Sequence, residues 1–253
     1  NAPLFIFIFV PEKQRIDTRN KNNPFIMKEI IQYLEGFATE ERVELFEKVI
    51  DNRTKYLTVV LEDIYQAQNA SAVLRSCDCF GIQDVHIIEN RNSFNVHREI
   101  AMGSSKWLTL NKYNEQENNT RQALRELKSQ GYRIVATSPH ENDVYLQDLD
   151  LSKGKAAIIF GTELTGISDI VKEEADEFIK VPMYGFTESF NISVCASLVM
   201  QDLATRIRKE NLPWQLSDQE KDELKFEWLK KSIRSSDRII EQWEEANKQQ
   251  KTI

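Results

Sequence analysis

Arg75 is the side chain whose position most favours chemistry in this chain. It ends the segment Asn69-Ala-Ser-Ala-Val-Leu-Arg75. Apolar residues recur there at helical spacing and predict one apolar helix face, made of Ala70, Val73, Leu74 and Cys77. Arg75 lies roughly opposite that face, where its guanidinium can bind a phosphate or ribose oxygen through two hydrogen bonds. A solvent-facing helix arginine gives the same pattern, and Asn69 is most simply the cap of this helix.

A second candidate segment is Phe160-Gly-Thr-Glu-Leu-Thr-Gly166, which directly follows a predicted strand. Gly161 lets the backbone turn tightly and approach a ligand. Glu163 sits in this turn, and Gly166 closes it. The segment is not the Gly-x-Gly-x-x-Gly dinucleotide fingerprint, whose first two glycines are two positions apart, and the chain has no P-loop. The alternative is an ordinary turn between a strand and a helix.

The third candidate segment runs from Val181 to Val194, with the sequence VPMYGFTESFNISV. Its proline and glycine indicate a loop, and Ser189 and Asn191 precede a long predicted helix that either of them could cap. Amides at a helix N-terminus also favour anionic or carboxylate ligands. The helix then presents an apolar face that suits close packing of two helices, including across a dimer; we assign to it Val194, Cys195, Ala196, Leu198 and Val199.

Alternating strands and helices must position these segments. The predicted strands are residues 56–61, 84–88, 132–137, 156–160 and 178–181. The predicted helices between and after them are residues 70–80, 119–130 and 191–209. Residues 91–114 read as a polar loop with short helical pieces. This order predicts an α/β domain with a mostly parallel sheet.

Helical extensions flank the predicted α/β domain. Residues 27–50 read as one or two helices, and after Pro213 a charged amphipathic helix follows the capping-box pair Ser217 and Glu220. We therefore divide the chain into residues 1–26, 27–54, 55–210 and 211–253. The apolar run 4–10 is too short to span a membrane and lacks the flanks of a signal peptide. We expect the natural protein to start at Met27; the alternative is that residues 1–26 form an edge strand or an oligomer contact.

Charge and composition restrict the classes of function. The net charge of −7 argues mildly against a nucleic-acid partner, because phosphate binding depends on Lys and Arg. A local basic cluster can still bind RNA, and the candidates are Arg91, Arg98 and Lys106; a solvated face is equally compatible with them. Three irregularly spaced cysteines predict no disulfide framework, and three scattered histidines predict no metal site. A reducing, cytoplasmic setting fits this composition.

In this order, the three candidate segments resemble the motifs of the SpoU (TrmH-type) branch of the SPOUT RNA methyltransferases, over residues 55–209. The resemblance implies methyl transfer from S-adenosylmethionine to a ribose 2′-hydroxyl of RNA. It also implies a homodimer with sites at its interface and a C-terminal deep trefoil knot, one of the rare exceptions to unknotted topology. The helical extensions look like those of the TrmH subgroup, which modifies guanosine 18 in the D-arm of tRNA. Ribosomal RNA is the alternative substrate.

The same resemblance assigns roles to residues. Arg75 matches the catalytic arginine, and because a free guanidinium is a poor base, we expect it to orient ribose and phosphate and to stabilise the developing alkoxide. Asn69 would hold this arginine or the substrate, Glu163 and Ser189 would shape the site, and Asn191 would keep it in register. The expected donor contacts are Thr137, Ser138, Gly161, Val181, Met183, Ser189 and Asn191.

Two departures from the family pattern and two competing classes of function accompany this resemblance. Phe190 stands where leucine or methionine is more usual, and the loop 184–188 is more acidic than an RNA-facing loop would prefer. A non-catalytic RNA-binding protein could keep the same fold, although all five polar site residues are present. A nucleotide-dependent oxidoreductase would need the missing glycine fingerprint.

Overall fold

The apolar runs of the sequence form the central strands of a parallel sheet. The computed structural model describes residues 24–94, 101–138, 144–162 and 165–249. It contains two compact units: the described residues up to Val43 together with those from Asp222, and residues Glu44–Lys221. The boundaries that we predict from the sequence stay a prediction, since these units divide within two helices.

The larger unit contains a seven-stranded sheet in the order β3-β2-β1-β6-β4-β7-β5, and every neighbouring pair is parallel. The strands are β1 Leu57–Glu62, β2 Asp84–Ile88, β3 Thr109–Tyr113, β4 Arg133–Thr137, β5 Val144–Tyr145, β6 Ala156–Phe160 and β7 Glu177–Lys180. All residues of β1 and β6 are buried, which explains why β6 is entirely apolar and β1 is apolar except for Thr58 and Glu62. The predicted α/β fold with a mostly parallel sheet is confirmed.

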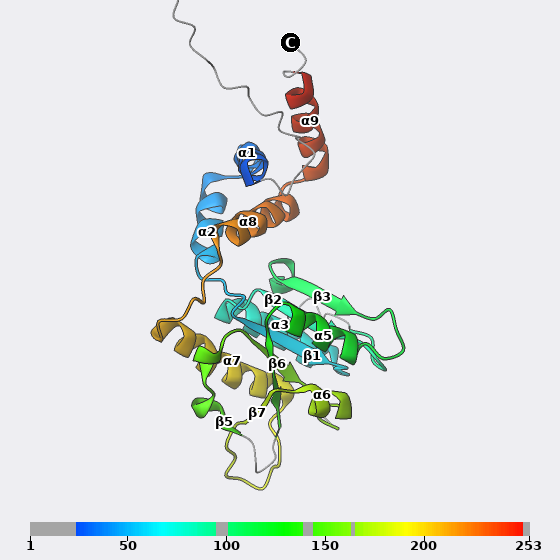
Figure 1. Cartoon of the computed structure of the whole chain (residues 1–253). Coiled ribbons are helices and arrows are strands. Elements are labelled where there is room, and N and C mark those ends of the chain that lie inside the picture. The colour runs from blue at the N-terminus through cyan, green and yellow to red at the C-terminus, as the bar shows by residue number, and fades with distance from the viewer. Residues whose placement is uncertain (1–23, 95–100, 139–143, 163–164, 250–253) are drawn as a thin grey trace, which may run out of the picture. The chain divides into compact units, whose positions relative to one another are not determined.

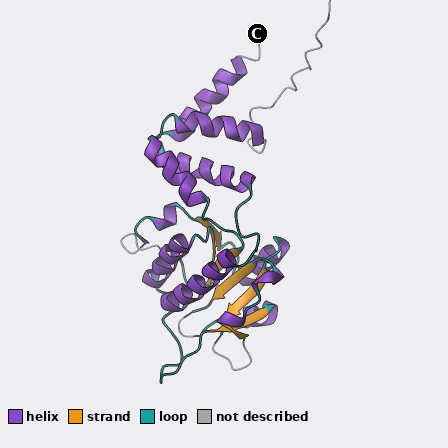
Figure 2. Ribbon diagram, turned by 90° about the vertical axis from the view of Figure 1, so that its left-hand side faces the viewer, coloured by secondary structure: helices purple, strands orange, loops and turns teal. Residues whose placement is uncertain are grey.

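Helices cover both faces of this sheet (Figures 1 and 2). Alternate residues of β1 point to opposite faces. Val59 joins a core with α3 (Ala67–Phe80) and α7 (Ile192–Lys209), whereas Val60 joins a second core with α5 (Thr120–Ser129) and α6 (Asp169–Glu174). Helices α3 and α7 also contact each other. The motif segments therefore belong to one layered unit.

Two sequence predictions are corrected, and two short elements were not predicted. The region 91–114 is not only loop, because β3 lies within it as an edge strand; only Tyr113 of its five residues is buried, so it has no apolar run. Strand β5 and helix α6 are too short to show periodicity. Asn69 does not cap α3, because this helix begins at Ala67 with Gln66 in the cap position.

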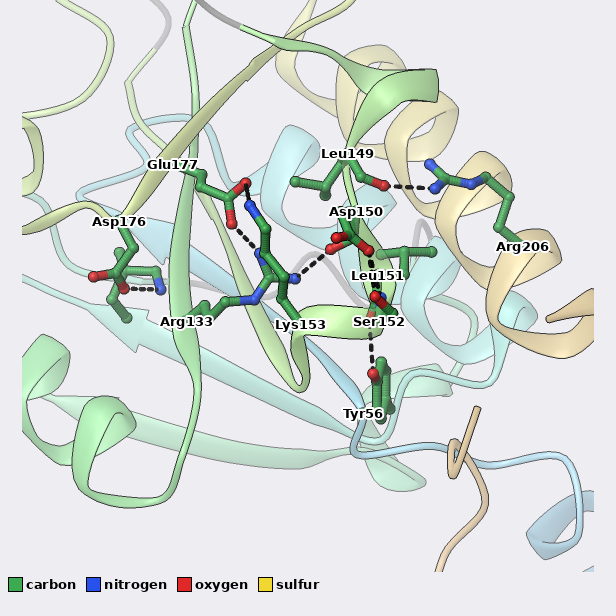
Figure 3. Close-up of polar contacts among 11 residues, drawn as sticks. Tyr56, Arg133, Leu149, Asp150, Leu151, Ser152, Lys153, Asp176, Glu177 and Arg206 are labelled. Carbon is green, nitrogen blue, oxygen red and sulfur yellow. Dashed lines mark hydrogen bonds and ion pairs between the residues drawn. The ribbon is translucent and has the colours of Figure 1, made fainter. Parts of the chain in front are cut away.

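The connection between β5 and β6 is fixed by polar contacts to its backbone (Figure 3). It contains two short 3₁₀ turns, η2 Leu146–Asp148 and η3 Leu151–Lys153. Tyr56 Oη donates to the Leu151 carbonyl at 2.6 Å. Arg206 of α7 donates to the carbonyls of Leu146 at 3.1 Å and Leu149 at 2.5 Å. The guanidinium of Arg206 thus serves as a structural clamp.

A buried carboxylate at the end of β1 joins the start of α5 to the loop beyond β6. Glu62 is 2% exposed and accepts hydrogen bonds from Thr120 Oγ1 at 2.7 Å and from Ser168 Oγ at 2.7 Å. The next residue, Asp63, accepts from three consecutive backbone N–H groups, those of residues 90–92, at 2.8–3.1 Å. Together the two carboxylates hold the loops at the carboxyl edge of the sheet.

The smaller unit is helical. It contains α1 (Pro24–Glu35), which packs on α9 (Ser236–Gln249), and the parts of α2 (Glu40–Ile50) and α8 (Asp218–Ser232) that belong to it. Lys225 and Glu35 form an ion pair at 2.5 Å. Two helices follow Pro213 where the sequence analysis expects one. The predicted capping box, which lies within the larger unit, is confirmed, because Ser217 N–H donates to Glu220 Oε2 at 2.9 Å and Glu220 N–H donates to Ser217 Oγ at 3.3 Å. None of the described helices is long and apolar enough to cross a membrane.

His86 of β2 makes the stability of the larger unit depend on pH. Burial lowers its pKa to about 4, and Nδ1 lies 3.0 Å from Tyr113 Oη. Below pH about 6.5 the unfolded chain therefore binds a proton that the folded chain does not, and stability falls as the pH decreases. We expect a contribution of about 3 kcal/mol between pH 7 and pH 4. In urea unfolding, the loss of stability between pH 7 and pH 4 should be about 3 kcal/mol smaller for His86→Gln than for wild type. Equal losses in the two proteins would contradict the assignment.

Candidate functional site

A cavity of about 430 Å³ opens at the carboxyl ends of three neighbouring strands. Its walls come from the ends of β4, β6 and β7, from the loops that follow them, and from α6 and the first turns of α7. In open parallel sheets this edge is where ligands bind. The volume lies in the range of small-molecule and cofactor sites. The lining residues include Phe160, Ile179, Val181, Met183, Ile192 and Val199 on the apolar side, and Thr137, Ser138, Thr162, Thr165 and Ser189 on the polar side.

Six of the seven residues expected to contact a donor line this cavity: Thr137, Ser138, Gly161, Val181, Met183 and Ser189. Asn191 is the exception. Lys172, Glu188 and Phe190 also line the cavity, and the sequence analysis did not select them. Glu188 and Phe190 flank Ser189, so their position next to this motif residue could have identified them. Nothing in the sequence pointed to Lys172, because its helix α6 was not predicted. Glu163 lies outside the described residues.

The end of β4 is tied to both neighbouring strands. Thr137 Oγ1 donates to the carbonyl of Ile159 on β6 at 3.0 Å. Ser138 N–H donates to the carbonyl of Ile179 on β7 at 3.0 Å. These hydrogen bonds fix the floor of the cavity, where three strands end together.

The loop after β6 closes on itself. Thr162 N–H donates to the Gly166 carbonyl at 2.9 Å, and Gly166 N–H donates to the Thr162 carbonyl at 3.1 Å. A Cβ on Gly161 would lie 2.2 Å from the Gly166 oxygen, so no other residue fits there without opening the loop. The sequence requirement for glycine therefore comes from close backbone approach within the loop.

Asn191 connects the third motif to the first. Its Oδ1 accepts from Ser193 N–H at 2.9 Å and caps α7, as predicted. Its Nδ2 donates to Asn69 Oδ1 at 3.1 Å, although the two residues are 122 positions apart. Asn69 Nδ2 in turn donates to Gln66 Oε1 at 3.2 Å, ahead of α3. One side chain thus fixes the start of α7 and joins it to the first turn of α3.

Arg75 is exposed on α3 and does not line the cavity. Among the described residues no hydrogen bond or ion pair engages its guanidinium. The next residue, Ser76, contacts Ser197 of α7, with their hydroxyl oxygens 2.9 Å apart. Helix α7 also lines the cavity through Ile192, Cys195 and Val199. Arg75 is therefore held on a helix that packs directly on the cavity wall.

The basic residues selected as RNA contacts are not gathered at one place. Arg91 is exposed after the carboxyl end of β2, on the same edge of the sheet as the cavity. Lys106 is exposed ahead of β3, and its Nζ lies 4.8 Å from the centre of the Trp107 ring. Because β2 and β3 are parallel, Lys106 lies toward the opposite edge. Arg98 lies outside the described residues.

The cavity offers no reactive thiol. Cys195 lines it, but burial raises the pKa of its thiol to about 11, so the side chain is protonated at neutral pH. Among the described residues no group of three or more His, Cys, Asp or Glu side chains could hold a metal ion. The backbone and hydroxyl groups that line the cavity can bind and orient a ligand.

Comparisons with known proteins agree with this arrangement. A profile of the SpoU rRNA Methylase family matches residues 56–201. The tRNA (guanosine(18)-2′-O)-methyltransferase of Borreliella burgdorferi is 44% identical over 205 residues, which cover 81% of this chain and 92% of that protein. The protein of the same name from Thermus thermophilus is 33% identical over 162 residues, covering 64% of this chain and 81% of that protein.

A solved structure gives the same assignment. The TrmH/SpoU tRNA modifying enzyme of A. aeolicus superimposes with a TM-score of 0.69 and 27% identity, covering 77% of this chain and 98% of that one. The resemblance read from the three motifs is therefore confirmed. Since the family profile spans more than half of the sequence and the Borreliella protein is matched over nearly its whole length, the chain belongs to the SpoU rRNA Methylase family.

Proposed function

We propose that this chain transfers a methyl group from S-adenosylmethionine to the ribose 2′-hydroxyl of guanosine 18 in the D-loop of tRNA. The observation that carries this proposal is the Asn191–Asn69 hydrogen bond, because it joins the loop beside a cofactor-sized cavity to the helix that presents Arg75. The curated relatives named for this reaction support the choice of tRNA. The family description names rRNA, which is the second candidate substrate.

The cavity suits the methyl donor. Its apolar wall can take an adenine ring, and its hydroxyl and backbone groups can hold the polar ends of the molecule. When bound, S-adenosylmethionine supplies an electrophilic methyl group on a sulfonium. Thr137, Ser138, Gly161, Val181, Met183 and Ser189 would hold it, and Asn191 would fix the start of α7 beside it.

Arg75 would act on the RNA rather than on the donor. Its exposed guanidinium can hold a phosphate oxygen and the ribose together through parallel hydrogen bonds. As the 2′-hydroxyl loses its proton, negative charge builds on the 2′-oxygen, and a fixed cation stabilises it. This charge is neutralised when the oxygen bonds to the methyl carbon and the carbon–sulfur bond breaks. The protein's main contribution is alignment of the two reactants. Asn69 would keep α3 in place, and the role expected for Glu163 stays a prediction.

The proposal includes a homodimer, a deep trefoil knot in the C-terminal part and a cytoplasmic location. Support for the dimer comes from α7, where Val194 is 47% exposed and Leu198 is 41% exposed. Ala196 and Val199 of the same predicted face are instead buried within the larger unit, so only part of that face is available. Two copies meeting along this exposed stripe would bring two cavities close to one interface.

We expect Arg75→Ala to lower the rate of methyl transfer at least 100-fold, because it removes the cation that stabilises the developing alkoxide. Arg75→Lys should recover only part of the rate, since it keeps the charge without the planar fork. The assay uses labelled S-adenosylmethionine and an unmodified tRNA transcript, followed by mapping of the methylated ribose.

A transcript with 2′-deoxyguanosine at position 18 is the matched control, since it lacks only the acceptor hydroxyl. Methylation of this control at the same level would contradict the proposed position, and transfer only to ribosomal RNA would favour the second substrate. Donor affinity should not change in Arg75→Ala; loss of folding would make Arg75 structural.

Gly161→Ala should weaken binding of S-adenosylmethionine by at least tenfold, as measured by isothermal titration calorimetry. The added Cβ would force the loop Gly161–Gly166 away from its closed form, at one wall of the cavity. Gly185→Ala is the matched control for donor binding, because nothing lies within 4 Å of the Cβ it would add. Equal donor affinities in the two variants would place the donor elsewhere.

A further inference from the structure

The loop between β7 and α7 carries three aromatic side chains within seven residues. Tyr184 is 96% exposed, Phe186 is fully exposed and Phe190 is 40% exposed. In Figure 1 the yellow loop that contains them extends past β7 and β5. Neither Tyr184 nor Phe186 stacks on another ring of the described part of the chain. Such a cluster of solvated aromatic rings adds nothing to the core, and it suits a binding surface.

This aromatic loop, Tyr184–Phe190, borders the candidate donor cavity. Glu188, Ser189 and Phe190 line the cavity, as does Met183 immediately before the loop. A nucleotide that brings its ribose to this cavity can therefore place its base within reach of the loop. Exposed aromatic rings are the platforms on which proteins stack unpaired RNA bases.

The charge of the loop argues for contact with a base and against contact with the RNA backbone. Glu188 is the only charged residue in the segment 182–190. Its side chain is exposed, and among the described residues no hydrogen bond or ion pair engages it. A carboxylate repels phosphate, whereas its two oxygens accept hydrogen bonds from two adjacent N–H donors.

Among the four RNA bases, guanine alone presents two such adjacent donors on its Watson–Crick edge, N1–H and the exocyclic N2 amine. Adenine and cytosine pair an amine with a ring acceptor, and uracil places carbonyl oxygens on both sides of its single N–H. A site with a free carboxylate therefore favours guanine and disfavours the other three bases, because each of those would leave a carboxylate oxygen unpaired or facing an acceptor.

We propose that the aromatic loop recognises the target base, with Glu188 accepting hydrogen bonds from N1–H and N2–H of an unpaired guanine that stacks on the exposed rings of Phe186 and Tyr184. Glu188 is thus a specificity-determining residue, although its negative charge disfavours contact with the RNA backbone. The inference rests on the proposed function and names the residues that select guanosine within that site.

The test compares wild type with Glu188→Gln on two tRNA transcripts that carry guanosine or inosine at position 18. Inosine lacks only the exocyclic N2 amine. We expect wild type to have a kcat/KM about 10- to 100-fold lower on inosine, the range for one hydrogen bond to a charged group. Glu188→Gln should lose a similar factor on guanosine and little on inosine, so that the ratio between the two substrates falls to about one.

Two further variants separate base reading from other roles. Thr187→Ala is the matched control, because Thr187 is an exposed neighbour that does not line the cavity, and its guanosine-to-inosine ratio should equal that of wild type. Phe186→Leu keeps apolar volume but removes the ring face. We expect it to raise KM several-fold on both transcripts without changing their ratio.

Several outcomes would overturn the inference. An unchanged guanosine-to-inosine ratio in Glu188→Gln would show that Glu188 does not read the base, and a matching loss of donor affinity would assign it to the donor. If the Phe186→Leu variant sediments as a monomer where wild type sediments as a dimer, the aromatic rings contact a second copy of the chain instead of a base. If wild type methylates neither transcript, the proposed function itself fails.

Discussion

The hydrogen bond from Asn191 to Asn69 is the interaction on which the arrangement of the site depends. The same Asn191 side chain caps α7, so a single residue sets where that helix starts and where it meets α3. Because α7 lines the cavity and α3 presents Arg75, both reactants are positioned from one point. The packing of α3 on α7, with Ser76 against Ser197, keeps this geometry along the helices.

The parallel sheet explains why the site lies at one edge. All seven strands run in the same direction, so the loops after β4, β6 and β7 leave the sheet side by side. Glu62 and Asp63, at the end of β1, hold the loops after β6 and β2 by accepting hydrogen bonds from Ser168 and from the N–H groups of residues 90–92. Removing the buried Glu62 carboxylate would lower the stability of the fold, since several hydrogen-bond donors would be left unpaired.

Much of this could be predicted from the sequence, and the limits have physical causes. Central strands such as β1 and β6 are buried on both faces, so their largely apolar sequences predict strands directly. Strand β3 lies at the sheet edge and carries polar residues, so its sequence is typical of a loop. Asn191 was recognised as a helix cap from its position. Its bond to Asn69 could not be predicted, because no local pattern encodes contact across 122 residues. Lys172 could not be selected for a different reason, because its six-residue helix α6 is too short to show periodicity.

The most direct test of this account is a double-mutant cycle between Asn191 and Asn69, read out as the single-turnover rate of methyl transfer. Asn191→Ser keeps a helix-capping hydroxyl but is too short to reach Asn69, and Asn69→Ala removes the acceptor. We predict that each single variant slows transfer with the fold intact, and that the double variant is no slower than the slower single variant. Fully additive losses would show that the two residues act independently, and would contradict the claim that this contact aligns the two reactants.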